Sequence, residues 1–155
     1  MFKLDTADAL LDAFRPKDRK TVDLGMLTFP LVVKDYVAWP HPGGGRVFIV
    51  FATPGGAPTG IAFDTNGAGA AVPAMCSWCH SSSVSGAGVG LLTATVNGNK
   101  RAGTLVCTDL SCREKLEEVA NRTGASVRPA MEKLVNRIGQ FASGALKIDL
   151  SGAGR

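Results

Sequence analysis

Residues 74–80, A-M-C-S-W-C-H, and residues 103–112, G-T-L-V-C-T-D-L-S-C, decide the fold of this chain. They contain its four cysteines, arranged as a C-x2-C pair and a C-x4-C pair. A C-x2-C turn lets two thiolates point at one ion, and zinc prefers four sulfur or nitrogen ligands in a tetrahedron. The spacing therefore predicts one structural Zn2+ ion, bound by Cys76, Cys79, Cys107 and Cys112.

Two other interpretations of the cysteines explain less of the pattern. Four unrelated buried cysteines would not be expected as two close pairs. A redox dithiol would use C-x-x-C, but no thioredoxin-like βαβ pattern surrounds it. The N-terminus lacks the features of a signal peptide, and no segment approaches the ~18 apolar residues of a membrane span. We therefore expect a cytoplasmic protein with reduced thiols and no membrane contact.

The segments around the second cysteine pair predict a hairpin and a helix. A strand at about 91–96 leads to Asn97-Gly98, a favoured hairpin turn, and the return strand at 102–106 delivers Cys107. Thr108 or Asp109 can cap the next helix, which places Cys112 in its first turn, where free N–H groups stabilise thiolate. A knuckle, a hairpin and a helix in this order form a treble clef. The apolar stripe of the helix is Leu110, Leu116, Val119 and Ala120.

Further from the cysteines, the pattern predicts a mixed chain. A helix is expected at 5–15, ended by Arg15-Pro16, and strands at 22–29, 47–52 and 60–63. Residues 66–74 read as a flexible lead, and a helix at 128–142 has an apolar face. The predicted fold is α+β, a small β-sheet with a treble-clef zinc finger and a C-terminal helix. It forms one domain over residues 1–155, with an N-terminal helix in 1–20, strands in 21–74, the treble clef in 75–120 and the last helix in 126–144.

Charge and composition favour a binding protein over an enzyme. Residues 100–155 hold ten Lys/Arg against six Asp/Glu, which accounts for the whole net charge of +4. Two histidines, and no Glu before Glu114, leave few groups for acid–base catalysis, so we expect no enzyme and no small-molecule substrate. The basic C-terminal third suits an acidic protein or RNA, and an RNA-binding zinc module of the translation machinery is the alternative function.

Several residues near the cysteines are candidates for partner binding. Trp78 lies between two predicted ligands, and it either protrudes as an interface anchor or packs as a lid over the metal. Four cations either join it in one aromatic-plus-basic patch or are scattered and solvated: Lys100, Arg101, Arg113 and Lys115. His80 follows Cys79 and is expected beside the site or in solvent, because four cysteines already complete the ligand set.

The same two cysteine segments closely resemble the C-terminal treble-clef zinc finger of the FusB/FusC-type elongation factor G-binding proteins, the FBP family. The resemblance is most specific over about residues 75–116. It implies a protein that binds elongation factor G through its zinc finger, which in the resistance proteins releases the factor from ribosomes stalled by fusidic acid. By position, it assigns the family's aromatic contact to Trp78 and its basic hairpin contact to Lys100 or Arg101.

One feature departs from the resistance proteins of this family. They carry a helical bundle ahead of the domain, whereas one short predicted helix precedes the strands here. The resemblance therefore implies binding to the factor or the ribosome, and it leaves three roles open: drug resistance, a housekeeping role at the ribosome, and binding to a different translation partner.

Overall fold

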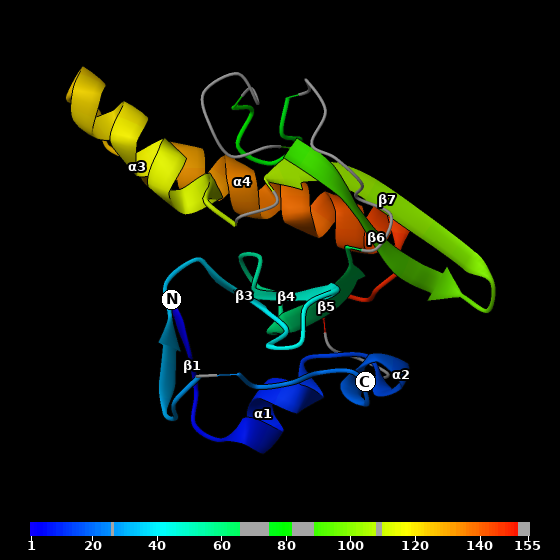
Figure 1. Cartoon of the computed structure of the whole chain (residues 1–155). Coiled ribbons are helices and arrows are strands. Elements are labelled where there is room, and N and C mark those ends of the chain that lie inside the picture. The colour runs from blue at the N-terminus through cyan, green and yellow to red at the C-terminus, as the bar shows by residue number, and fades with distance from the viewer. Residues whose placement is uncertain (26, 66–74, 82–88, 108–109, 152–155) are drawn as a thin grey trace.

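The computed structural model describes residues 1–25, 27–65, 75–81, 89–107 and 110–151, and its elements confirm the α+β class (Figure 1). Five strands form an antiparallel sheet in chain order, from β3 (Tyr36–Pro40) through β4 (Arg46–Phe51), β5 (Thr59–Asp64) and β6 (Val89–Asn97) to β7 (Lys100–Cys107). Two short strands, β1 (Phe2–Leu4) and β2 (Leu31–Val33), pair separately. The helical elements are α1 (Ala7–Asp12), α2 (Pro16–Arg19), α3 (Cys112–Thr123), α4 (Arg128–Gln140) and the π-helical turn η2 (Phe141–Ala145). None of the described helices is both long and apolar enough to cross a membrane.

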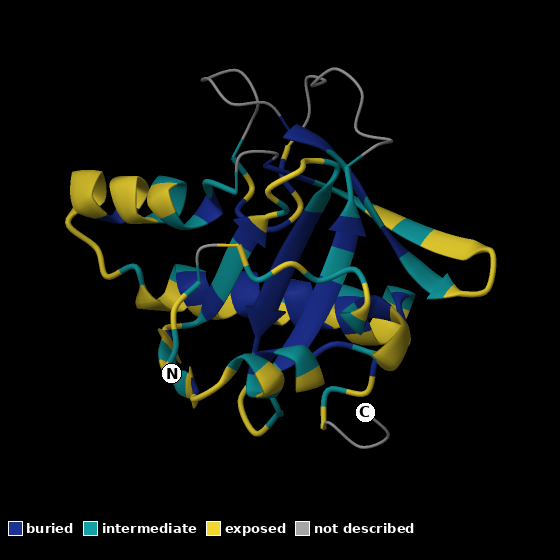
Figure 2. Ribbon diagram, turned by 60° about the horizontal axis from the view of Figure 1, so that its bottom comes forward, coloured by how far each residue is buried: buried dark blue, intermediate teal, exposed yellow. Residues whose placement is uncertain are grey.

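Both faces of the main sheet are covered, which explains the unbroken apolar run in β4. Successive residues of a strand point to opposite faces. Val47 and Ile49 of β4 join a cluster with α4 and the cysteines, whereas Phe48 and Val50 join a second cluster with the N-terminal elements. A strand buried on both faces reads as continuously hydrophobic. The sheet therefore separates the cysteine side of the molecule from the N-terminal side (Figure 2).

The N-terminal layer is built from two short helices rather than the single helix expected at 5–15. Thr6 caps α1 by accepting a hydrogen bond from the amide of Ala9 at 3.1 Å. Arg15 is extended before Pro16, as expected of a residue before proline, and Pro16 then begins α2. Phe14 lies between the two helices and is fully buried. Its ring packs edge to face against that of Trp39 in β3, with 6.3 Å between the ring centroids.

The expected strand at 22–29 is wrong for its described residues, which form no strand. The amide of Gly25 donates to the Asp23 carboxylate at 2.8 Å, and Gly25 has a φ of +59°, so the chain turns there. Leu24 and Leu27 nevertheless pack against the N-terminal cluster. Apolar and polar residues therefore alternate in this segment because it is a loop that covers a core, and not because it is a strand. The strands lie later in the chain, at β2 and β3.

The C-terminal half follows the predicted order closely. The expected hairpin is present as β6 and β7, but its turn is Gly98-Asn99, one residue later than the expected Asn97-Gly98, because Asn97 pairs with Lys100. The apolar face of α4 is buried as expected, at Met131, Leu134, Val135 and Ile138. Helix α3 lies mostly in solvent, and its Val119, expected in an apolar stripe, is 47% exposed (Figure 2). The lead at 66–74 lies outside the described residues. The expected cap at Thr108 or Asp109 is wrong, because the cap residue of α3 is Ser111, directly before Cys112.

Replacing Gly60 by alanine is expected to destabilise the protein by about 1–3 kcal/mol, as overpacking of a core does. A Cβ at Gly60 would lie 2.7 Å from three ring atoms of Phe14, which is held by Trp39 and Phe48. Urea denaturation followed by circular dichroism measures the change. Gly144→Ala is the matched control, because its Cβ would meet nothing within 4 Å. Equal stability of the two variants would contradict the tight contact between Phe14 and β5.

Candidate metal centre

The first cysteine pair sits in a tight turn whose backbone is held at both ends. The amide of Cys76 donates to the Ser81 carbonyl, and the amide of His80 donates to the Cys76 carbonyl, each at 2.9 Å. His80 has a φ of +60°, which closes the turn, and its side chain is exposed. The amides of Trp78 and Cys79 both donate to the Cys76 sulfur at 3.4 Å. These two donors stabilise negative charge on that sulfur.

The second pair is placed by the end of a strand and the start of a helix, as the sequence predicts. Cys107 is the last residue of β7 and pairs with Val89 of β6. Cys112 is the first residue of α3. The amide of Ser77 donates to the Leu105 carbonyl at 2.7 Å, which fastens the first turn to β7. Turn, hairpin and helix therefore converge on one point.

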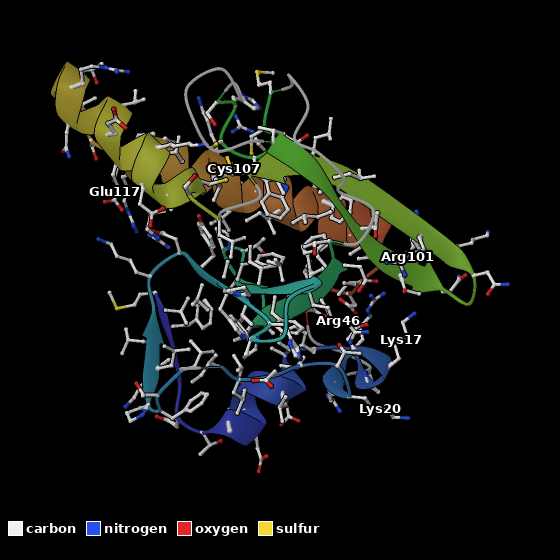
Figure 3. All side chains as sticks on the ribbon, in the orientation of Figure 1. Lys17, Lys20, Arg46, Arg101, Cys107 and Glu117 are labelled. Carbon is white, nitrogen blue, oxygen red and sulfur yellow. The ribbon has the colours of Figure 1, made fainter. Side chains whose placement is uncertain are left out.

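The four sulfurs at this point have the dimensions of a tetrahedral zinc site. All four lie within 4.8 Å of one another, and all four cysteines are buried. Cys76 and Cys112 are 3.7 Å apart at sulfur, and Cys79 and Cys107 are 3.6 Å apart. A Zn–S bond of about 2.3 Å gives a tetrahedron with edges of about 3.8 Å. The donor set and its spacing thus match one closed, four-sulfur zinc ion (Cys107 is labelled in Figure 3).

The surroundings favour negative charge on Cys107. Lys115, one turn into α3, donates to its sulfur at 3.2 Å, and the Ser81 hydroxyl lies 3.6 Å from it. Hydrogen bonds with Cys112 and then with Cys76 lower the pKa of the Cys107 thiol below its usual value. The pKa of Cys112 is raised, first by its hydrogen bond with Cys107. The four thiols therefore share their protons unequally, and a divalent cation would replace those protons.

Trp78 is a buried lid of the site and not an exposed anchor. Its side chain is 6% exposed, and the centroid of its ring lies 5.8 Å from that of the Phe63 ring. Arg137 of α4 donates to the Trp78 carbonyl at 2.6 Å. The turn between the two cysteines is therefore fixed to the sheet through the indole and to α4 through the carbonyl. Of the two placements that the sequence left open, the structure has the packed one.

The four candidate cations do not form one patch beside the metal. Arg113 turns toward β3, where it donates to the Lys34 and Tyr36 carbonyls, each at 2.7 Å, and stacks on the Tyr36 ring. Lys115 contacts the Cys107 sulfur, as described above. Lys100 and Arg101 begin β7, whose other end is Cys107. Seven residue steps of about 3.3 Å along β7 separate Lys100 from Cys107 by about 23 Å.

An exposed apolar side chain that the sequence pattern did not indicate lies at the rim of the site. Met75 directly precedes Cys76 and is 59% exposed. Methionine is enriched at protein interfaces relative to the rest of the protein surface. Its position next to the first cysteine was visible in the sequence, but the sequence did not indicate that Trp78 points inward and Met75 outward.

Comparisons with known proteins agree with this geometry. The family described as the FBP C-terminal treble-clef zinc-finger matches residues 8–144. Among solved structures, the chain resembles one described as the structure of the fusidic acid resistance protein FusC, with a TM-score of 0.53 and 15% identity. The alignment covers 96% of this chain and 60% of FusC, so this chain spans less than two thirds of that protein. At this identity the likeness shows the fold alone. No match was found among curated proteins. The family and the four clustered sulfurs together identify the metal as one structural zinc ion.

Proposed function

Because this chain belongs to the FBP C-terminal treble-clef zinc-finger family, we propose that it is a non-catalytic binding protein that engages elongation factor G. The resemblance of the cysteine segments to the factor-binding zinc finger supports this partner. The likeness in fold to a fusidic acid resistance protein is consistent with it. Such a partner places the protein in the cytoplasm, where the factor works on the ribosome. Release of a stalled factor is the activity that the resemblance implies.

The observation that carries the proposal is the closed, buried set of four sulfurs. We assign Cys76, Cys79, Cys107 and Cys112 as the zinc ligands, because together they fill a tetrahedron. A zinc ion with four cysteine ligands keeps no open position for a substrate, so it serves to hold structure. What it holds is the turn at 75–81 against β7 and α3. The zinc ion thus fixes a surface and performs no chemistry.

The surface that the zinc ion fixes has an apolar centre and a distant basic arm. Met75 is the exposed apolar residue, and Ser77 and His80 beside it are exposed and polar. An apolar anchor with a polar rim is the usual composition of an interface. Lys100, at the tip of the β6–β7 hairpin, is exposed and can reach a second point on a large partner. We therefore propose Met75 and Lys100 as contact residues, with Trp78 and Arg113 in supporting positions.

Met75→Asp and Lys100→Glu are each expected to weaken binding to purified elongation factor G by about tenfold, the equivalent of about 1.4 kcal/mol. The first substitution places a charge where an apolar contact forms, and the second reverses a charge on the arm. Isothermal titration calorimetry with the zinc-loaded protein measures both affinities. Zinc content is determined in parallel, since neither side chain is among the clustered sulfurs.

Val119→Asp is the control for Met75→Asp, because Val119 is also an exposed apolar residue but lies on α3. It is expected to leave the affinity unchanged. The proposal fails if the unmodified protein gives no binding heat at tens of micromolar. If Val119→Asp weakens binding as much as Met75→Asp does, the assignment of Met75 as the apolar contact residue is wrong.

A further inference from the structure

Four cations line one side of the molecule away from the metal. Lys17 and Lys20 come from α2 and its end, Arg46 begins β4, and Arg101 is the second residue of β7. Figure 3 labels all four, and they follow one another down the right-hand side of the view, from the β6–β7 hairpin to α2. We refer to these four residues as the basic strip.

Contacts between these elements show that the strip is continuous. The Lys17 ammonium donates to the Val96 carbonyl at 3.0 Å, and the Arg101 guanidinium donates to the neighbouring Thr95 hydroxyl at 3.1 Å. Arg101 also pairs with Asp64 of β5, whose other carboxylate oxygen lies 3.4 Å from Arg46. Helix α2, β4 and the hairpin are thus joined at adjacent positions, although their sequences are far apart.

The strip carries excess positive charge. Asp64 is the carboxylate that both arginines share, so four cations and one anion leave a net charge of +3. Asp18, on the same helix as Lys17, is buried and paired with Arg15 at 2.8 Å, and it therefore positions α2 without neutralising the strip. The exposed acid Glu117 of α3 lies at the opposite side of Figure 3. A net positive charge on one side of the molecule attracts a polyanion to that side.

The chemistry of the strip suits phosphates better than a protein surface. Protein interfaces draw most of their energy from a few Trp, Tyr and Arg anchors that fill well-packed pockets without water. The strip has no aromatic residue, and its two arginines are partly exposed and share Asp64. The large exposed apolar residues of the described chain are Met1, Val32, Met75 and Val119, and none of them belongs to the strip. Arginine presents a planar fork of donors that matches phosphate oxygens, and lysine adds a point charge. We infer that the basic strip binds the phosphate backbone of RNA, without base recognition.

The basic strip differs from the surface that the sequence suggested, which was the basic C-terminal third at residues 100–155. Arg113 and Lys115 from that segment turn inward. Arg113 donates to the Lys34 and Tyr36 carbonyls, and Lys115 donates to the Cys107 sulfur. Three of the four residues of the strip come instead from the first half of the chain, where the sequence is electrically neutral overall. The inference does not depend on the proposed partner, because it uses neither Met75 nor the zinc ligands.

The inference is tested by fluorescence anisotropy with two labelled probes, a 20-nucleotide uridine oligomer and a 20-base-pair RNA duplex, each added to the zinc-loaded full chain. Neutralising about four phosphates gives a slope of log K against log salt of about −3. The affinity then falls about 60-fold between 50 and 200 mM salt. The double variant Lys17→Gln/Lys20→Gln is expected to reduce the slope to about −1.5 and to weaken binding at least tenfold at 50 mM salt.

The matched control is Arg122→Gln/Lys133→Gln, which removes the same charge from exposed positions on α3 and α4. It is expected to leave the slope near −3. Lys20→Gln alone tests the strip if loss of the Lys17 contact with Val96 disturbs the fold. If the two double variants weaken RNA binding equally, the affinity depends on the net charge of the protein and not on the basic strip. That result would overturn the inference. The inference is also overturned if neither RNA probe binds at 50 mM salt. It is overturned as well if the protein binds only polyglutamate, a polyanion without phosphates that is added as a third probe. Calorimetry with elongation factor G on the same variants separates this failure from that of the proposed function.

Discussion

Cys107→Ser is expected to cost the protein its stoichiometric zinc and the folded structure around it. Serine oxygen is a much poorer ligand than thiolate for zinc, and the remaining three sulfurs would hold the ion weakly. Structural zinc contributes on the order of 10 kcal/mol in zinc-finger peptides, which is comparable to the whole stability of a domain. The turn at 75–81 is attached to the rest of the described chain largely through these sulfurs, Trp78 and the Ser77 amide. Without the ion, we expect this end of the molecule to open.

Zinc content by atomic emission and thermal unfolding by circular dichroism measure the two effects. Ser81→Ala is the control, because the Ser81 hydroxyl contacts two of the sulfurs at 3.1 and 3.6 Å but is not among the four-sulfur set. It should retain one zinc ion per chain. Addition of a strong chelator to the unmodified protein should reproduce the effect of Cys107→Ser. A reduced protein that contains no zinc and unfolds at the same temperature with and without chelator would contradict the metal site.

Trp78→Ala is the second change with a large expected effect, a loss of about 3–5 kcal/mol in the free energy of unfolding. The indole is buried against Phe63 and belongs to the core cluster that contains the cysteines. Alanine would leave a cavity under the zinc turn. The turn would keep the hydrogen bond from Arg137, since this bond uses the backbone carbonyl. The zinc ion should therefore stay bound while the midpoint of denaturation falls.

Guanidinium denaturation at fixed zinc concentration measures this loss, and Trp78→Phe is the matched variant, because it retains an aromatic ring next to Phe63. We expect Trp78→Phe to recover more than half of the lost stability. A different result is expected if the indole is a contact for the partner: Trp78→Ala would then leave the unfolding midpoint in place and weaken binding to elongation factor G. That result would refute the role of Trp78 as a lid.

The zinc ligands were predictable from the sequence because their geometry is local. Two residues between Cys76 and Cys79 fix a turn, and a hairpin turn at Gly98 returns the chain to Cys107. The helix then begins at Cys112, five residues later. Each of these steps depends on short-range backbone preferences. The face of α4 was predictable for the same reason, since a 3.6-residue period appears in the sequence itself.

The strands before the cysteines were less predictable, because their pairing partners lie far away in sequence. Residues around Leu24 and Leu27 alternate as a strand would, yet they cover the N-terminal cluster as a loop. The run in β4 indicated a strand but not that both of its faces are covered, one by α4 and the other by the N-terminal helices. Apolar periodicity reports that a side chain is buried, and does not report what buries it.

By itself, the sequence determined the metal, its four sulfurs and the order of turn, hairpin and helix around them. Only the tertiary structure decided which nearby side chains face outward. It buries Trp78, exposes Met75, turns Arg113 toward β3, and brings Lys17 beside Arg101. The physical reason is that ligand spacing is set by a few adjacent dihedral angles. The direction of a side chain and its neighbours depend instead on how distant elements pack.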